Sequence, residues 1–267
     1  MTEAPGIRLP PGFWNEVGKA RRRILLLDYD GTLVPLRKDR DEARLPPRVA
    51  AILSAIAGAR GEEVAVLSGR PLDELVRFLG DLPVHLVGEH GWEVRRRDGR
   101  TARHPLRPEA ADALRRGAEA AEAAGMGPLL ERKLTAVVLH TRNAPAGLAR
   151  DLERTCRRLW TEHAVGQAVA LVPMNGGLEL RAAGRDKGTA LAELVKEAGP
   201  GALAVYVGDD ITDEDAFREV RRHGFGIRVG GDSRASLAAG RIDSCDAVER
   251  FLRDWAAALD SSGRREA

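Results

Sequence analysis

The chain has 267 residues, 43% of them hydrophobic, which is enough to bury one large core or a core with an inserted second domain. Its formal net charge is only +2 and its acidic and basic residues are interspersed, so nucleic-acid binding is not expected. The sequence has no apolar run of about 18 residues and no recognisable signal peptide, so we expect a cytoplasmic protein without a membrane partner.

We expect the two cysteines and the arginine cluster at residues 21–23 to have no functional role. Cys156 and Cys245 lack the spacing of a zinc site or a disulfide framework, and we expect both to be plain buried residues. The basic cluster at residues 21–23 directly precedes an apolar run, and we expect these arginines to remain in water.

In chain order, the first part alternates short apolar strands with helices. Strands are expected at residues 24–27, 64–67 and 84–87, and helices at residues 49–60 and 72–79. The alternation resumes after Arg185, with helices expected at 187–198, 212–222 and 248–259 and strands at 202–207 and 226–229. This rhythm is typical of an α/β protein, and we predict that residues 1–100 and 183–267 form one Rossmann-like core with a parallel sheet.

The middle of the chain has a different pattern. Two helices are expected at residues 109–124 and 147–163, with extended segments at 134–140, 168–172 and 178–181. Two helices over a small antiparallel sheet would form a separate α+β layer structure. We therefore predict that residues 101–182 are an inserted cap domain.

A pair of carboxylates follows the first expected strand, in the run Asp28-Tyr29-Asp30-Gly31-Thr32. In open α/β sheets the reactive site lies at the carboxyl ends of the strands, so Asp28 is expected in that crevice. There it can attack phosphorus, while Asp30 protonates the leaving oxygen and then deprotonates water. The alternatives are a simple turn capped by both acids, or a calcium loop, which would follow a helix and need glutamate where the chain has Asp39.

A second acidic cluster, Asp209, Asp210 and Asp213, follows another expected strand. Placed next to Asp28, it would form an oxygen-rich pocket suited to Mg²⁺. The metal would offset the repulsion between a phosphate and the carboxylate nucleophile.

Part of this cluster also fits a structural role. Thr212 with Asp215 fits a capping box, and acids in the first turn of a helix favour its dipole without any metal. Asp209 is therefore the principal expected ligand, Asp213 fits both interpretations, and Asp210 would support the site.

Two further polar segments lie at expected strand ends or helix starts. Ser68-Gly69-Arg70 offers a hydroxyl and free backbone N–H groups where an anion can bind, although Ser-Gly is also an ordinary turn. Lys187 opens a helix, where the macrodipole disfavours a cation, so its position suggests a nearby anion unless it is a solvated surface lysine. Unrelated turns would rarely place an acid pair, a serine, a lysine and an acid cluster in this order, each at the end of a strand or the start of a helix. The order therefore favours one shared site.

With these residues in view, the sequence resembles the haloacid dehalogenase phosphatase superfamily and, within it, the trehalose-6-phosphate phosphatases. The resemblance covers nearly the whole chain and rests on DYDGTLVPL (28–36), LSGR (67–70), GEHG (88–91), ERK (131–133), LHTRNAP (139–145), GLELR (177–181), DKGTAL (186–191) and GDDITDEDAF (208–217). The runs at 28–36, 67–70, 186–191 and 208–217 contain the superfamily motifs, whereas the GEHG, E-x-K, H-x-R-N and GDDxTDEDAF details are more specific to the trehalose branch.

The resemblance implies that Asp28 is the nucleophile of an aspartyl-phosphate mechanism and Asp30 the acid/base. It implies Mg²⁺ held by Asp28, Asp209 and the main-chain oxygen of Asp30, with Asp213 as a further candidate. The phosphate-binding residues that it implies are Thr32, Ser68, Gly69 and Lys187. The implied reaction is hydrolysis of trehalose 6-phosphate, the final step of trehalose biosynthesis, with a functional link to a trehalose-6-phosphate synthase and a cap that closes over the sugar.

Five residues are candidates for substrate contact by the same resemblance: Arg70, Glu131, Lys133, Arg142 and Glu179. A disaccharide needs several polar partners because its hydroxyls both donate and accept hydrogen bonds. The alternative is that some of these residues form surface ion pairs. His90 and His140 are interpreted as packed core histidines.

Three rival functions remain at this point. A phosphoryl-accepting response regulator uses a similar residue set, but such a domain is shorter and does not need Asp30. A non-catalytic sugar-phosphate sensor need not keep both Asp28 and Asp30. A phosphatase of the same superfamily could act on another glycosyl or trehalose-like phosphate.

Overall fold

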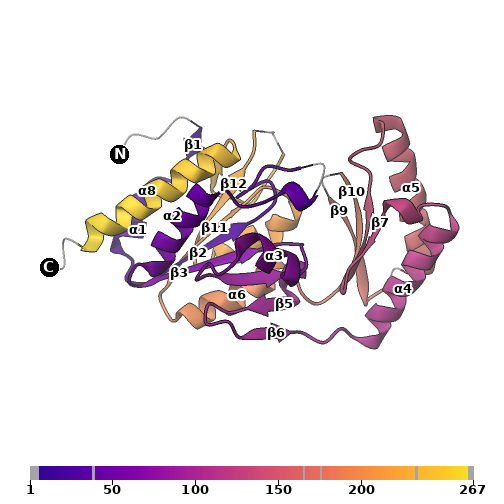
Figure 1. Ribbon diagram of the computed structural model, residues 1–267, viewed down its shortest axis with the longest axis horizontal. Coiled ribbons are helices and arrows are strands. Elements are labelled where there is room, and N and C mark those ends of the chain that lie inside the picture. Colours follow the sequence, from indigo (N-terminus) through magenta and orange to yellow (C-terminus); the bar gives the residue numbers. More distant parts are fainter. Residues whose placement is uncertain (1–5, 38–39, 165, 175, 232–233, 264–267) are drawn as a thin grey trace. The chain divides into compact units, whose positions relative to one another are not determined.

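The computed structural model describes residues 6–37, 40–164, 166–174, 176–231 and 234–263, so Asp39 lies outside the described residues. The chain divides into two compact units (Figure 1). The first, here called the core unit, comprises Met1–Ala102, Asp186–Asp209 and Asp213–Ala267. The second, the insert unit, comprises Arg103–Arg185 together with Asp210–Thr212.

A nine-stranded sheet forms the centre of the core unit, in the order β1-β13-β12-β11-β2-β3-β4-β5-β6. The strands are β1 (Ile7–Arg8), β2 (Arg23–Asp28), β3 (Glu62–Leu67), β4 (His85–Gly88), β5 (Glu93–Arg95), β6 (Thr101–Arg103), β11 (Leu203–Gly208), β12 (Gly224–Val229) and β13 (Gly240–Ile242). The run from β13 to β4 is parallel, whereas β1 and β5 pair antiparallel with β13 and β4.

Helices cover both faces of this sheet, because alternate residues of each buried strand point to opposite sides. In β2, Leu25 and Leu27 pack into one core and Ile24 and Leu26 into the other. The first core is closed by α1 (Phe13–Lys19), α2 (Pro47–Gly58), α3 (Leu72–Leu79) and α8 (Cys245–Gly263), and the second by α6 (Lys187–Ala198) and α7 (Glu214–Val220).

The insert unit is an antiparallel sheet with two helices. Its strand order is β7-β8-β10-β9, with β7 (Leu130–Arg132), β8 (Ala136–His140), β9 (Val169–Met174) and β10 (Gly177–Ala182). The helices α4 (Pro108–Ala123) and α5 (Ala146–His163) pack against each other, and the buried Trp160 donates its indole N–H to Gly117 O at 2.9 Å. The α/β fold with an inserted α+β part is therefore confirmed.

The expected strands and helices are all present, with shifts at their ends. The expected helix at residues 212–222 is shorter, because a 3-10 turn at Ile211–Asp213 precedes α7. The sequence pattern did not predict five short strands or α1. Two or three residues carry too little periodicity to indicate a strand, and α1 has only seven residues. None of the described helices combines the length and apolar character that crossing a membrane requires.

Two expectations about single residues need correction. Arg23 is buried rather than solvated, because it forms an ion pair with the buried Glu62 and donates to Val17 O at 2.8 Å. Cys156 is buried as expected, but Cys245 is only half-buried and its thiol donates to Gly31 O at 3.1 Å.

Candidate active site

A buried lysine bridges two carboxylates at the carboxyl ends of neighbouring strands. Lys187 Nζ lies 2.5 Å from Asp28 Oδ1 and 2.6 Å from Asp213 Oδ1. Asp28 ends β2, and Asp209 follows β11, which pairs parallel with β2. Asp28, Asp209 and Asp213 place one ligand atom each within 4.8 Å of one another.

The position of Lys187 at the start of α6 has a local explanation. Asp186 caps the helix by accepting from the Thr189 backbone N–H at 2.7 Å, and the Thr189 hydroxyl accepts from the Asp186 N–H at 2.9 Å. This capping box fixes the first turn, so that the lysine side chain is directed to the acids. The predicted nearby anion is present, in the form of two carboxylates, and the solvated-lysine alternative is wrong because only 2% of Lys187 is exposed.

Burial dominates the electrostatics of this cluster. Burial raises the pKa of Asp28 to about 7, although the Lys187 ammonium opposes the rise. Burial by itself would lower the pKa of Lys187, but Asp213 and Asp28 raise it above its ordinary value. Lys187 is therefore a permanent cation at neutral pH, and it compensates the charge of an ionised Asp28.

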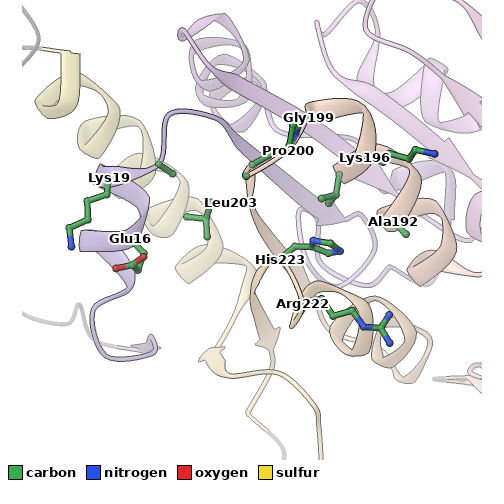
Figure 2. Close-up of a pocket in the computed structure, with 13 residues that line it drawn as sticks. Glu16, Lys19, Ala192, Lys196, Gly199, Pro200, Leu203, Arg222 and His223 are labelled. Atoms are coloured by element: carbon green, nitrogen blue, oxygen red, sulfur yellow. The ribbon is translucent and has the colours of Figure 1, made fainter.

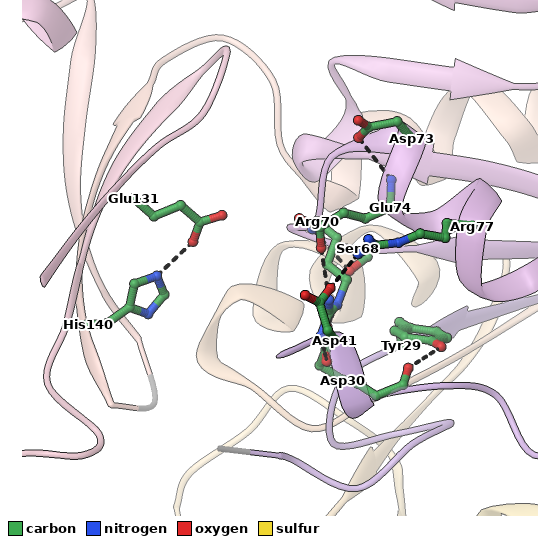
Figure 3. A network of polar contacts seen from close by, with 11 residues as sticks. Tyr29, Asp30, Asp41, Ser68, Arg70, Asp73, Glu74, Arg77, Glu131 and His140 are labelled. Atoms are coloured by element: carbon green, nitrogen blue, oxygen red, sulfur yellow. Dashed lines mark hydrogen bonds and ion pairs between the residues drawn. The ribbon is translucent and has the colours of Figure 1, made fainter. Parts of the chain in front are cut away.

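Asp30 lies two residues beyond Asp28 and is held by a different cation (Figure 3). Its two carboxylate oxygens accept from Arg70 at 2.6 and 2.7 Å, and Arg70 also donates to Glu74 at 2.8 Å. Arg70 is buried, with 3% exposed, and packs over the Phe78 ring at 5.0 Å. Its guanidinium is therefore fixed beside Asp30.

A tight turn after Asp30 brings the chain against Asp209. Gly31 has a φ of 88°, and a Cβ at this position would collide with the Asp209 carboxylate. Glycine is therefore suited to this position for two reasons: it adopts a positive φ without strain, and it has no Cβ to collide with the Asp209 carboxylate. The buried Thr32 follows, with its hydroxyl 3.4 Å from Asp209 Oδ1.

The segment at residues 68–70 follows β3, next to Asp28. The Ser68 N–H donates to Val87 O at 2.9 Å and the Arg70 N–H donates to Ser68 Oγ at 3.2 Å. The sequence predicted free N–H groups in this segment, and for these two residues that expectation is wrong. The difference arises because α3 begins only at Leu72, so the Ser68 N–H bonds to β4 and the Arg70 N–H bonds within the loop.

The three acids of the second acidic cluster have different surroundings in the structure: Asp209 and Asp213 lie close to Asp28, whereas Asp210 does not belong to this group. Thr212 and Asp215 do not form the predicted capping box, because α7 begins at Glu214 with Asp213 as a cap residue that has no side-chain cap bond. Asp213 instead accepts from Lys187. Asp210 lies outside the carboxylate triad and accepts from the Thr212 hydroxyl at 3.4 Å.

Two further residues of the core unit support these acids and were missed by sequence reasoning. The buried Tyr206 hydroxyl donates to Asp213 Oδ1 at 2.6 Å, and Arg234 donates to Asp209 O at 2.6 Å. A tyrosine in a fully buried strand usually needs a hydrogen-bond partner, and this signal alone would have indicated Tyr206. Arg234 has no comparable sequence signal.

The candidate sugar-contacting residues of the insert unit form their own polar pairs. Glu131 Oε2 lies 2.7 Å from His140 Nε2 (Figure 3), and Lys133 Nζ lies 3.8 Å from the buried Glu179 Oε1. Arg142 is exposed. Lys133 and Glu179 do not form the surface ion pair of the alternative interpretation, because their side chains are only 9% and 3% exposed.

A separate groove of about 790 Å³ lies on the core unit (Figure 2). Lys19, Lys196, Arg222, His223 and Leu203 are among its lining residues. Leu203 begins β11, whereas Asp209 follows the end of that strand. The groove therefore lies at the amino-terminal end of β11, whereas the carboxylates lie at its carboxyl end.

The chain is similar to known proteins in both sequence and fold. The trehalose-phosphatase family model matches residues 26–240, a span that contains both acidic motifs, Ser68 and Lys187. The chain belongs to the trehalose-phosphatase family.

Within the family, a probable trehalose-phosphate phosphatase of Sinorhizobium fredii is 36% identical over 232 residues and 85% of each chain is covered. A bifunctional trehalose-6-phosphate synthase/phosphatase of Thermoproteus tenax is 32% identical over 85% of this chain, which spans 31% of that protein. The C-terminal domain of Candida albicans trehalose-6-phosphate phosphatase has the same fold, with a TM-score of 0.80, 22% identity and coverage of 93% of this chain and 98% of that one.

Proposed function

We propose that the chain hydrolyses trehalose 6-phosphate to trehalose and inorganic phosphate through an aspartyl phosphate on Asp28. The contact between Lys187 and Asp28, inside a triad of carboxylates at the carboxyl ends of β2 and β11, carries the proposal. Family membership supports the choice of substrate.

In the first step, a carboxylate oxygen of Asp28 attacks phosphorus, and the bond between phosphorus and the sugar oxygen breaks. Burial disfavours the ionised nucleophile, and the ammonium of Lys187 offsets that penalty. Lys187 also stays positively charged near the phosphoryl oxygens, where negative charge is concentrated in the transition state.

Asp30 supplies the proton for the leaving sugar oxygen and removes a proton from the water that hydrolyses the aspartyl phosphate. The bonds from Arg70 to both oxygens of Asp30 suit the carboxylate form, which acts in the second step. In the first step Asp30 must carry a proton, so one of the two bonds must be released.

A divalent cation fits the triad of Asp28, Asp209 and Asp213. Carboxylate oxygens are hard ligands of the kind that Mg²⁺ prefers, and one from each residue lies within 4.8 Å of the others. We therefore propose Mg²⁺ as the cofactor. When bound, it would supply charge neutralisation between the phosphate and the aspartates.

The insert unit is proposed to recognise the sugar through Glu131, Lys133, Arg142 and Glu179. The pairing of Lys133 with the buried Glu179 provides an ammonium and a carboxylate at one position, which suits hydroxyls that both donate and accept. Arg70 is fixed by Asp30 and Glu74, so its proposed contribution is to position Asp30.

Release of inorganic phosphate from trehalose 6-phosphate, compared with a panel of other sugar phosphates, tests the proposal. A preference of at least tenfold in kcat/KM for trehalose 6-phosphate is expected. Preference for a different glycosyl phosphate would show that the substrate is another sugar phosphate of the same superfamily. The absence of turnover on every sugar phosphate would favour a non-catalytic sensor.

The fused Thermoproteus protein further supports a functional link to a trehalose-6-phosphate synthase.

A further inference from the structure

A short turn at residues 88–91 of the core unit holds the 68–70 loop by its backbone. The Glu89 N–H donates to Arg70 O at 2.8 Å, and the His90 N–H donates to Ser68 O at 2.9 Å. The two amide groups thus bind the first and the last carbonyl of the loop. We call residues 88–91 the strap.

The strap has an unfavourable backbone conformation at two adjacent residues. Glu89 has a φ of 44° and His90 a φ of 55°, in the left-handed region that residues other than glycine rarely adopt. Both are also buried, with 3% and 7% exposed. Strain of this kind persists only where the surrounding structure imposes it, and it is concentrated at functional sites.

The His90 side chain contacts the loop as well. A Cβ built at Gly69 would lie 2.5 Å from His90 Nε2 and 2.7 Å from His90 Cε1. The imidazole therefore lies directly against the Cα of Gly69 and prevents the loop from moving in that direction. No larger residue fits at position 69 while His90 keeps this orientation.

We propose that His90 is a positioning residue, whose imidazole holds the 68–70 loop in the conformation that binds phosphate. The inference rests on the proposed function only in taking this loop as part of the phosphate site. Because Arg70 of the same loop donates to Asp30, the orientation of the acid/base residue depends on the same contact.

The test uses His90→Gly, which keeps both backbone N–H groups and relieves the strain while it removes the imidazole. We expect the variant to remain folded, because the relief of strain offsets part of the packing that is lost with the buried imidazole, and circular dichroism checks this. The dissociation constant for inorganic phosphate, measured by calorimetry with Mg²⁺ present, should increase about tenfold because the loop is no longer held in place. Unchanged phosphate affinity in this variant would overturn the inference.

His85→Asn is the matched control. His85 lies on β4 in the same segment of the chain, and its Nε2 is 2.9 Å from Glu63 Oε2. This variant should bind phosphate within about twofold of the parent protein. An equal loss in both variants would show a general effect on the sheet and would contradict the proposal.

A double-mutant cycle isolates the contact itself. Gly69→Ala should weaken phosphate binding strongly in the parent protein, because the new methyl group meets the imidazole, but only slightly in the His90→Gly background. Additive losses would contradict the proposal. Since the readout is phosphate binding, a protein that shows the coupling but does not hydrolyse trehalose 6-phosphate would disprove the proposed substrate and leave the role of His90 intact.

Discussion

Lys187 Nζ lies 2.5 Å from Asp28 Oδ1, although the two residues are 159 positions apart in the sequence. Both side chains are almost fully buried, with 3% and 6% exposed, so neither charge is stabilised by water. Each residue therefore depends on the other, and the predictions below concern this pair and the groups around it.

Asp28→Asn should retain the fold and reduce turnover by on the order of 10⁴-fold or more, because the amide cannot form the acyl phosphate. Steady-state phosphate release, with circular dichroism as a check of folding, measures this. Activity within tenfold of the parent enzyme would contradict the mechanism.

Asp30→Asn should separate the two half-reactions. Phosphorylation of Asp28 by an aryl phosphate with a good leaving group should continue, whereas hydrolysis of the aspartyl phosphate should slow, because only proton transfer is lost. Rapid-quench kinetics with aryl and sugar phosphates measures both steps. An equal loss of the phosphorylation rate for the two substrates would show that Asp30 does not protonate the leaving group.

Stability without metal should depend on pH through Asp28. Burial raises its pKa from an ordinary value of 3.8 to about 7, so between these values the folded state binds a proton that the unfolded state releases. The contribution of Asp28 to stability is therefore fully present below about pH 4 and is lost as the pH rises to about 7. It decreases by at most about 1.4 kcal/mol per pH unit.

Melting temperatures in chelator at several pH values, for the parent protein and for Asp28→Asn, measure this contribution. The parent protein should lose stability relative to the variant as the pH rises from about 4 to 7. A difference between the two proteins that does not vary with pH would show that Asp28 is already ionised in the folded protein.

Lys133→Ala should reduce kcat/KM for trehalose 6-phosphate by about 10² to 10³-fold, because sugar hydroxyls and Glu179 would lose their partner. A small aryl phosphate should be hydrolysed almost as before. Arg132→Ala is the matched control, since Arg132 is exposed and pairs with Glu122 on the surface of the same unit. Parallel loss on both substrates, or no loss on either, would show that Lys133 does not select the sugar.

Much of the fold was predictable because strands and helices of sufficient length carry their own periodicity. The apolar runs before Asp28 and Asp209 are β2 and β11, and the helix expected at residues 187–198 is α6 (Figure 1). The short paired strands β1 and β13 could not be predicted, because two or three residues become strands only through their neighbours.

The sequence by itself determined which carboxylates, which lysine and which loops follow the strands, because residue type and strand order are local properties. Only the tertiary structure decided how these groups are paired. The Asp213 side chain accepts from Lys187 and Tyr206 instead of from the backbone of α7, and Arg70 is directed to Asp30. The strap at residues 88–91 likewise has no local signal that explains its conformation. Partners distant in the sequence are selected by burial, because each polar group removed from water must find a partner within the folded chain.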